Sequence, residues 1–414
     1  MTRCVVVGAG AREHALAWAL ARRAEVVVTP GSAGIAAHGF ACVDTPATEL
    51  DGDLFVIGPE QPLVDGLADE LRAQGKVVVG PGADGARLEG SKSYMKDFLA
   101  RAGVPTAAYG SFADETGALA FLDSMRPPYV VKTDGLAAGK GVLVTNDVDE
   151  ARRDVRAKLS GAAFGDAGTT VVIEEGLVGE ECSLLFLCSG ASAAPLVAAQ
   201  DFKRVGDHGV GANTGGMGAY APMASMGPEQ VGAVQRLIID PTLRELHARG
   251  IDFRGVLYAG VMLTERGPTL LEYNVRFGDP EAEVLVALYG DTLFDQLLRV
   301  GRGQAVQIGG PVSDCAVTVI LAAAGYPERP RRGDLIAGLG PNGQLARPLE
   351  GVIIFHAGTE QRPDGHFVTA GGRVLAVTAV APTLDEARRR AYQGASLVTF
   401  EGKVMRSDIA RDVA

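Results

Sequence analysis

The first hundred residues contain short, almost continuous Val and Ile runs that alternate with helical segments. Helices are expected at residues 11–23 and 63–74, and the apolar runs around them read RCVVVG, EVVVT, DLFVIG and KVVVG. Strands that are apolar on both faces and joined by helices form a parallel sheet that is covered on both sides. Another helix is expected at 91–101, before Gly103 and Pro105. We therefore predict an N-terminal, Rossmann-like domain over residues 1–101.

The other three quarters of the chain are expected to form two further regions, since 414 residues exceed one ordinary core. A second α/β region is predicted over 102–310, with 119–190 as a small lobe of its own. The polar, glycine-rich stretch 301–311 is the expected linker to an α+β region over 311–414. That last region should have strands near 315–323, 351–357 and 373–380, and a helix that begins at Thr383 with capping-box spacing to Glu386.

Composition excludes several classes of function. The formal net charge is −11, and neither a basic stripe nor an aromatic-basic platform is present, which argues against a general nucleic-acid or membrane-surface protein. No segment has the roughly 18 uninterrupted apolar residues of a membrane helix, and no signal-peptide core is seen. The five cysteines are scattered through strand-like runs, as is typical of reduced thiols. We expect a cytoplasmic protein that acts on small molecules.

A row of polar side chains is predicted on the segment LEYNVRF at residues 271–277. If this segment is a strand, Glu272, Asn274 and Arg276 share one face. A carboxylate and an amide oxygen suit a hard cation such as Mg²⁺, which shares its ligands with substrate phosphates, and Arg binds phosphate or carboxylate bidentately. Taken alone, the row is more simply explained as the solvated face of a half-exposed strand.

A glycine turn, GAGAREH at residues 8–14, follows the first strand and opens a helix. Backbone N–H groups and the helix dipole at such a turn favour an anion. A dinucleotide fold is disfavoured, because Glu13 replaces the third glycine of the fingerprint and no acidic residue ends the second strand. An exposed, charged helix start is the alternative. The residues expected at this anion site are Gly8, Gly10, Arg12, Glu13 and His14.

Two lysines flank the glycine-rich loop VVKTDGLAAGKG at residues 130–141. Lys132 stands at a strand end and Lys140 lies between Gly139 and Gly141, an arrangement that favours a flap over a polyphosphate. The spacing is not that of a Walker A loop. Lys96, on the preceding predicted helix, would add a third positive group unless it is only solvated.

The segment EEGLVGEE at residues 174–181 offers two acidic pairs around a short apolar hinge. Backbone groups near Glu175 and Leu177 are suited to an adenine edge, and Glu181 to ribose hydroxyls. A hinge with surface glutamates is the simpler alternative.

A second glycine-rich site is predicted at residues 200–220, QDFKRVGDHGVGANTGGMGAY. Consecutive N–H groups of GANTGGMG can converge on an anion, while Asp201, Lys203 and Arg204 offer charges for a small zwitterion. A disordered loop is the alternative, but the segment lacks a Ser/Pro bias and lies between strand-like runs, which favours a site.

In this order and over essentially the whole chain, these segments resemble the glycinamide ribonucleotide synthetases (phosphoribosylamine-glycine ligases), a family of ATP-grasp enzymes. The motifs that carry the resemblance are GSKSYMKDFL, DGLAAGKGV, NTGGMG and NVRFGDPE. It implies a multidomain α/β and α+β fold in which 102–310 is the ATP-grasp core and its small lobe is mobile. It also implies ATP-dependent ligation of glycine to 5-phosphoribosylamine in de novo purine biosynthesis, through glycyl phosphate, by a monomer that uses Mg²⁺ or Mn²⁺.

The resemblance further assigns roles to individual residues. Glu272 and Asn274 would bind the metal, and Lys132, Glu272 and Arg276 would carry the chemistry. Glycine would be oriented by Asp201, Lys203 or Arg276. The ATP site would comprise Lys96, Lys132, Gly139, Lys140, Gly141, Glu174, Glu175, Leu177 and Glu181. The substrate site would comprise Gly8, Gly10, Arg12, Glu13, His14, Asp201, Lys203, Asn213, Thr214, Gly215, Gly216, Met217, Gly218, Arg276, Gly278 and Asp279.

The chain departs from the family pattern at a few positions, of which Phe202, in place of the usual His, and Glu283, in place of the usual Gln, bear most on substrate contacts. Two rival functions remain open at this point. One is an ATP-grasp ligase for another acid or amine, and the other is a non-catalytic nucleotide-binding or sensor protein. Phosphate release with glycine, with other acids and with both substrates separates them.

Overall fold

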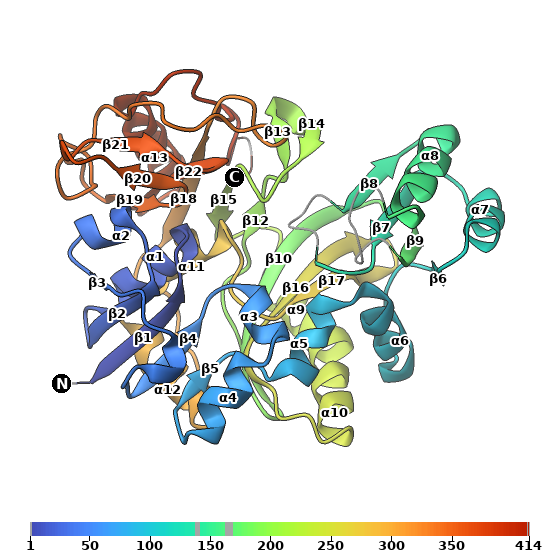
Figure 1. The fold of residues 1–414 in the computed structure, drawn as a ribbon. Coiled ribbons are helices and arrows are strands. Elements are labelled where there is room, and N and C mark those ends of the chain that lie inside the picture. Colours follow the sequence, from blue (N-terminus) through green and yellow to red (C-terminus); the bar gives the residue numbers. More distant parts are fainter. Residues whose placement is uncertain (1, 137–140, 162–168, 412, 414) are drawn as a thin grey trace.

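The computed structural model describes residues 2–136, 141–161, 169–411 and 413, and Figure 1 shows their arrangement. The predicted multidomain α/β and α+β fold is confirmed. At the N-terminus lies a parallel sheet in the order β3-β2-β1-β4-β5. Its strands are β1 (Arg3–Gly8), β2 (Glu25–Pro30), β3 (Ala41–Cys42), β4 (Leu54–Ile57) and β5 (Val78–Val79).

The helices of this region show why local sequence ends them where it does. The helix expected at 63–74 is two helices, because Gly66 takes a left-handed conformation (φ 91°) that interrupts the chain direction. Ser91 caps the helix Lys92–Ala102 by accepting from Tyr94 N, and Gly103 ends this helix. The helices are α1 (Ala11–Leu20), α2 (Ala33–Ala37), η1 (Ala47–Glu49), α3 (Glu60–Val64), α4 (Leu67–Ala73), α5 (Ala83–Gly90) and α6 (Lys92–Ala102).

A small lobe stands apart from the body of the molecule on the right of Figure 1. Its sheet has the order β6-β9-β7-β8, and it has its own apolar core around Val131, Ile173 and Leu122. The next strand, β10 (Glu180–Ser189), pairs with β16 and belongs to the central sheet. The lobe consists of β6 (Tyr109–Phe112), α7 (Glu115–Asp123), β7 (Tyr129–Thr133), β8 (Val142–Thr145), α8 (Val148–Leu159) and β9 (Val171–Glu175).

The central sheet has the order β11-β10-β16-β17 and is antiparallel where β10 and β17 meet β16. Of the helices in this part of the chain, α9 (Pro228–Val234), the π-helical turn η4 (Gln235–Ile239) and α12 (Thr292–Gly301) contact this sheet. The helix α10 (Asp240–Ala248) packs on η4 and α6, and α11 (Glu281–Tyr289) packs on α1 and the C-terminal sheet. A separate two-stranded hairpin is formed by β13 (Arg204–Gly206), η3 (Asp207–Gly209) and β14 (Val210–Asn213). The other strands are β11 (Ser192–Pro195), β16 (Arg254–Thr264) and β17 (Gly267–Asn274).

The C-terminal sheet is shared with the middle of the chain, in the order β12-β15-β18-β22-β19. β15 pairs with β18, so two strands from residues 200–221 complete a sheet whose other strands begin after residue 314. Thr383 caps the last helix by accepting from Glu386 N, as the capping-box spacing predicts. The elements are β12 (Gln200–Asp201), β15 (Gly218–Ala221), β18 (Cys315–Ala322), β19 (Val352–His356), β20 (Thr359–Gln361), β21 (Phe367–Thr369), β22 (Arg373–Ala381) and α13 (Leu384–Leu397).

Two expectations from composition bear on the described part of the chain. All five cysteines are free thiols, and burial raises the pKa of the Cys182 thiol to about 12. A search of the described helices finds none with the length and apolar character needed to cross a bilayer.

Candidate active site

The polar row on β17 lies on the wall of a pocket. Glu272, Asn274 and Arg276 all line it and are half-buried, whereas Tyr273, Val275 and Phe277, on the other face, are buried. The predicted alternation is therefore confirmed, although β17 ends at Asn274 and leaves Arg276 just beyond the strand. A register shift opposite Gly260 and Val261 precedes the row, a bulge that re-aims the side chains after it.

The pocket is built where the three regions of the chain meet, because each region contributes charged side chains. The part before residue 102 supplies Arg12, Glu60, Glu89 and Lys92; the middle region supplies Asp201, Lys203, Tyr258, Asp279 and Glu281 besides the row itself; the C-terminal region supplies Arg373. Of the residues predicted for the site, those that line the pocket are Arg12, Gly141, Asp201, Lys203, Thr214, Gly215, Glu272, Asn274, Arg276 and Asp279.

Carboxylates of the N-terminal region hold the Arg276 guanidinium. Nη2 lies 2.7 Å from Glu89 Oε1, and Nε lies 3.3 Å from Glu60 Oε2. The same guanidinium donates to Asn274 Oδ1 at 3.1 Å. Burial by itself would lower the pKa of Arg276, but Glu89 and Glu60 outweigh it and raise the pKa. Arg276 therefore orients Asn274, and its charge is largely compensated by protein groups.

Lys96 and Lys132 share one buried carboxylate, Glu174. Lys96 Nζ is 2.8 Å from Glu174 Oε2, and Lys132 Nζ is 2.9 Å from Oε1. Lys96 also donates to Thr106 Oγ1 and Lys132 to the carbonyl of Leu271, next to Glu272. Burial would raise the pKa of Glu174, yet the two lysines lower it, whereas burial lowers the pKa of Lys96 to about 8. Glu174 thus fixes both ammonium groups from behind the pocket.

The other two glutamates predicted for the hinge near β9, Glu175 and Glu181, form ion pairs with other parts of the protein. Glu175 forms an ion pair with Arg266 at 2.8 Å, and its N–H donates to the carbonyl of Ala108. Glu181 pairs with Lys203. Gly139 and Lys140, predicted for the phosphate flap, lie outside the described residues.

The glycine turn after β1 closes around Glu13. Gly10 N donates to Glu13 Oε2 at 2.7 Å, and a Cβ on Gly8 or Gly58 would lie 2.5 Å or 2.0 Å from atoms of Glu13. The turn glycines therefore make room for a buried carboxylate. Arg12 lines the pocket and donates to the carbonyl of Phe277.

The expectation that His14 lines the mouth of the anion site is wrong. The His14 side chain is fully buried among His38, Phe355 and His356. Its Nδ1 accepts from His356 N at 2.9 Å, so the neutral ring carries its proton on Nε2, which lies 2.7 Å from His38 Nδ1. Helical periodicity explains the error, because His14 is two positions after Arg12 and faces the opposite side of α1.

The second glycine-rich segment supplies two charged groups to the pocket. Lys203 lies between Glu181 and Asp201, with 3.8 Å from Nζ to Asp201 Oδ2. Asp201 Oδ1 is buried without a hydrogen-bond partner in the described structure. Burial is the main cause that raises the pKa of Asp201, and the negative charge of Glu281 raises it further. An unpaired, buried carboxylate oxygen on a pocket wall needs a donor, which a ligand N–H would supply.

Backbone conformation explains the glycines of NTGGMG. Gly216 has φ 110°, and a Cβ there would lie 2.4 Å from Pro280 and 2.6 Å from Asp201 Oδ1. Gly215 approaches Arg373, which donates to its carbonyl. Met217 is fully buried and packs in the core instead of facing the pocket.

Sequence reasoning missed Arg373. This side chain crosses from β22 into the pocket, where it is 3.2 Å from Asp279 Oδ2 and donates to the carbonyl of Asp279 at 2.8 Å. Its only signal in the sequence is a single charge at the start of the apolar run RVLAVTA. Glu60 and Glu89 were also missed, because their partner Arg276 lies far away in the sequence.

The two departures at Phe202 and Glu283 differ in their surroundings. Phe202 does not line the pocket, and its ring packs near Tyr220 and under the Arg406 guanidinium. Glu283 is fully buried, and its two carboxylate oxygens have no hydrogen-bond partner in the described part of the chain. Burial and the nearby Asp279 raise the pKa of Glu283, because both disfavour the charged form of its carboxyl group.

The donor set on β17 fits a hard divalent cation. Glu272 and Asn274 provide one carboxylate and one amide oxygen on the pocket wall, close to the lysine pair. A site with so few protein oxygens suits a cation that completes its shell with phosphate oxygens and water. In the described residues, no group of three or more His, Cys, Asp or Glu side chains is placed to hold a metal by itself.

The chain matches models of one protein family over three consecutive stretches. Family models described as phosphoribosylglycinamide synthetase match as an N domain at residues 2–89, an ATP-grasp (A) domain at 90–282 and a C domain at 316–412. Proteins named phosphoribosylamine--glycine ligase are 46% identical in Mesorhizobium japonicum and 44% in Brucella melitensis, each over 98% of this chain and 97% of the relative.

Solved structures give the same result. The crystal structure of a phosphoribosylamine--glycine ligase from Thermotoga maritima is similar with a TM-score of 0.88 and 36% identity, over 98% of this chain and 100% of that one. A biotin carboxylase domain of Hydrogenobacter thermophilus, in complex with MgADP, shares the fold with a TM-score of 0.73 at 16% identity, over 98% and 92% of the two chains.

Proposed function

The chain belongs to the phosphoribosylglycinamide synthetase family, and from that premise we propose how its pocket carries out the family's reaction. The protein is an ATP-dependent ligase that joins glycine to phosphoribosylamine in purine biosynthesis, and it uses ATP and a divalent metal. The observation that supports the assignment of roles is the meeting of the β17 row and the Asp201–Lys203 pair at one pocket, with Lys132 of the buried lysine pair hydrogen-bonded to the Leu271 carbonyl beside the row.

The ATP phosphates are proposed to bind at the lysine end of the pocket. Lys132, whose ammonium lies beside the Leu271 carbonyl, contacts the phosphates, and Lys96 adds positive charge from a more buried position. Glu174 holds these two lysines in place instead of touching the nucleotide. The hinge near Glu175 and Leu177 takes the adenine, and Glu181 is the candidate for ribose contact once it exchanges Lys203 for ligand hydroxyls.

The metal is proposed to be held by Glu272 and Asn274, with Mg²⁺ or Mn²⁺ both compatible with these oxygens. When bound, it neutralises phosphoryl charge that develops during transfer. Arg276 donates to the Asn274 amide oxygen and so fixes the orientation of that amide.

Glycine is proposed to bind at Asp201 and Lys203. Lys203 attracts the carboxylate, and the unpaired Asp201 Oδ1 accepts a hydrogen bond from the amino group. Arg276, the third candidate, is less suitable because Glu60 and Glu89 already compensate its charge.

Phosphoribosylamine is proposed to bind between the first glycine turn and the NTGGMG segment. A Cβ built on Gly10 lies 4.0 Å from Asp279 Oδ2, and Arg373 donates to the carbonyls of both Asp279 and Gly215, so Asp279 and Arg373 link the two segments. Arg12 and Arg373 supply the positive charge for the 5-phosphate, and Thr214 and Gly215 supply the wall.

In the proposed mechanism, a glycine carboxylate oxygen attacks the γ-phosphorus, the bond to the bridging oxygen breaks, and glycyl phosphate and ADP form. The phosphoribosylamine nitrogen then attacks the acyl carbon, forms the amide, loses a proton and releases phosphate. Lys132 and Lys203 stabilise negative charge at the two ends of the transferred group.

The test measures ADP production with glycine and freshly generated phosphoribosylamine, separately and together. Dependence on both supports the ligase. Turnover with a different acid instead of glycine would favour a related ligase, and ATP binding without turnover would favour a nucleotide-binding protein. Glycine-dependent exchange of the β,γ-bridging oxygen of ATP, without the amine, tests for glycyl phosphate.

We further propose a cytoplasmic monomer whose regions divide at 1–101, 102–310 and 311–414. The mobile lobe, predicted at 119–190, is proposed to comprise β6 to β9, because β10 belongs to the central sheet. The sharing of β15 with the C-terminal sheet supports one cooperative unit for the last two regions. Light scattering measures the mass in solution, and limited proteolysis locates the boundaries.

A further inference from the structure

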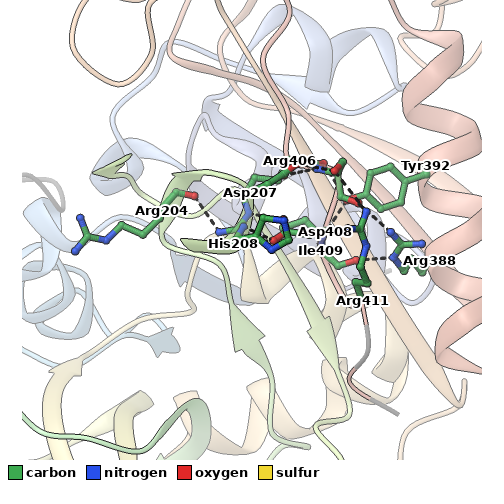
Figure 2. A network of polar contacts seen from close by, with 10 residues as sticks. Arg204, Asp207, His208, Arg388, Tyr392, Arg406, Asp408, Ile409 and Arg411 are labelled. Carbon is green, nitrogen blue, oxygen red and sulfur yellow. Dashed lines mark hydrogen bonds and ion pairs between the residues drawn. The ribbon is translucent and has the colours of Figure 1, made fainter. Parts of the chain in front are cut away.

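The C-terminal end of the chain returns to the hairpin beside the active site. Residues 406–409, named here the C-terminal strap, lie against β13–β14 and its turn, as Figure 2 shows. None of the strap residues lines the pocket. The strap and the hairpin are about 200 residues apart in sequence, so no local pattern predicts the contact.

Arg406 is the centre of this contact. Its Nε and Nη2 donate to Asp408 Oδ1 and Oδ2, both at 2.7 Å, and its Nη1 donates to the carbonyl of Arg204 at 3.1 Å. The guanidinium also lies 4.9 Å from the centre of the Phe202 ring. The side chain is only 4% exposed, and all three guanidinium nitrogens donate to a specific partner.

The turn of the hairpin is fixed by the neighbouring residues of the strap. His208, which has φ 57°, donates its N–H to Asp408 Oδ2 at 2.7 Å. Asp207 accepts from Ser407 N at 2.7 Å and from Ser407 Oγ at 2.6 Å (Figure 2). A non-glycine residue in the left-handed region persists because the strap holds it there.

A short path connects Arg406 to the pocket. Phe202 lies between Asp201 and Lys203 in sequence, and both of these line the pocket. The backbone of Phe202 pairs with Gly218 and Met217, and the carbonyl of Lys203 accepts from Thr214 N and Oγ1, both at 2.8 Å. Arg406 therefore holds residues 202 and 204, one on each side of Lys203.

We propose that Arg406, clamped by Asp408, is a positioning residue that sets the Asp201–Lys203 pair for glycine. This inference rests on the proposed binding of glycine at that pair. Loss of Arg406 frees the ring of Phe202 and the carbonyl of Arg204, so the Asp201–Lys203 pair no longer holds the glycine carboxylate in line with the γ-phosphate. The two lysines that pair with Glu174 lie on α6 and β7, away from the hairpin, and keep their geometry.

The experiment compares Arg406→Ala, Asp408→Asn and Phe202→Leu with the wild type in glycine-dependent ADP release. Each variant is expected to raise the KM for glycine, by about tenfold or more for Arg406→Ala, and to leave the KM for ATP within about twofold. Added guanidinium at low concentration should restore part of the glycine affinity of Arg406→Ala and none in the wild type. Phe202→Leu keeps an apolar side chain, so it tests the stacking contact where the arginine variant fails to fold.

Arg388→Ala is the matched control. Arg388 donates to the carbonyls of Ile409 and Ser407 and lies over Tyr392, so it holds the same strap from the side of α13. It is expected to lower thermal stability without raising the glycine KM. An unchanged glycine KM in Arg406→Ala, or an equal rise in Arg388→Ala, overturns the inference. A wild type without glycine-dependent ADP release overturns the proposed function instead.

Discussion

Replacement of Glu174 by Gln tests the buried charge cluster most directly, because one carboxylate serves two ammonium groups. Glu174 is 2% exposed, and its oxygens lie 2.8 Å and 2.9 Å from Lys96 and Lys132. At an effective dielectric constant of about 20, one such contact corresponds to roughly 6 kcal/mol of attraction before desolvation is subtracted. The variant removes this attraction while the desolvation of both lysines remains.

The net loss of stability is expected to be about 3–5 kcal/mol, the range for breaking a buried ion pair from one side. The loss is not twice that of one ion pair, because Lys96 still donates to Thr106 Oγ1 and Lys132 still donates to the carbonyl of Leu271. Denaturant unfolding measures the stability, and initial rates measure the KM for ATP. The KM should rise as well, because the two lysines repel each other and move apart.

Glu175→Gln is the control for the same substitution one residue later. Glu175 is paired with Arg266, whose side chain is 73% exposed, so this loss should stay below about 1 kcal/mol. If the free energies of unfolding of the two variants differ by less than about 1 kcal/mol, the buried cluster does not stabilise the protein as described.

Three other predictions concern the proposed metal ligand Glu272, the buried His356 and the pocket residue Arg373. Glu272→Gln should lower kcat at least about a hundredfold with unchanged unfolding, and normal turnover would refute its role. His356, whose pKa burial lowers to about 4, stays neutral when folded, so the unfolded chain binds more protons between pH 4 and 6.5. Stability should therefore fall as the pH drops through that window, and His356→Gln should reduce the slope by up to about 1.4 kcal/mol per pH unit in pH-dependent unfolding. Arg373→Lys should raise the KM for phosphoribosylamine about tenfold and spare that for ATP, because an ammonium cannot reproduce the two-sided contact with Asp279 and Gly215; equal shifts for both substrates would argue against it.

Much of the fold follows from local patterns. The N-terminal strands β1, β2, β4 and β5, the Thr383 cap and the strands β18, β19 and β22 lie where periodicity and turn residues predict them. The division of the helix expected at 63–74 was missed, because a glycine inside a helical pattern does not by itself reveal a left-handed conformation. The sharing of β15 with β18 also has no local signal.

The candidate site was predictable in its chemistry and less so in its geometry. The row Glu272, Asn274 and Arg276 could be read from a two-residue period, and the lysines from the loops that hold them. The buried place of His14 could not, since it depends on residues of β19 that come some 340 positions later.

Sequence by itself therefore determined the residue types in the pocket and the order of the elements that carry them, because these follow from backbone periodicity and side-chain chemistry. The tertiary structure decided which charges stay available. Arg276 is compensated by Glu60 and Glu89, whereas Asp201 keeps a buried oxygen without a partner. The sequence specifies which ionisable groups are present. Whether an opposite charge neutralises such a group depends on distances in space, and those are set only when distant segments pack together.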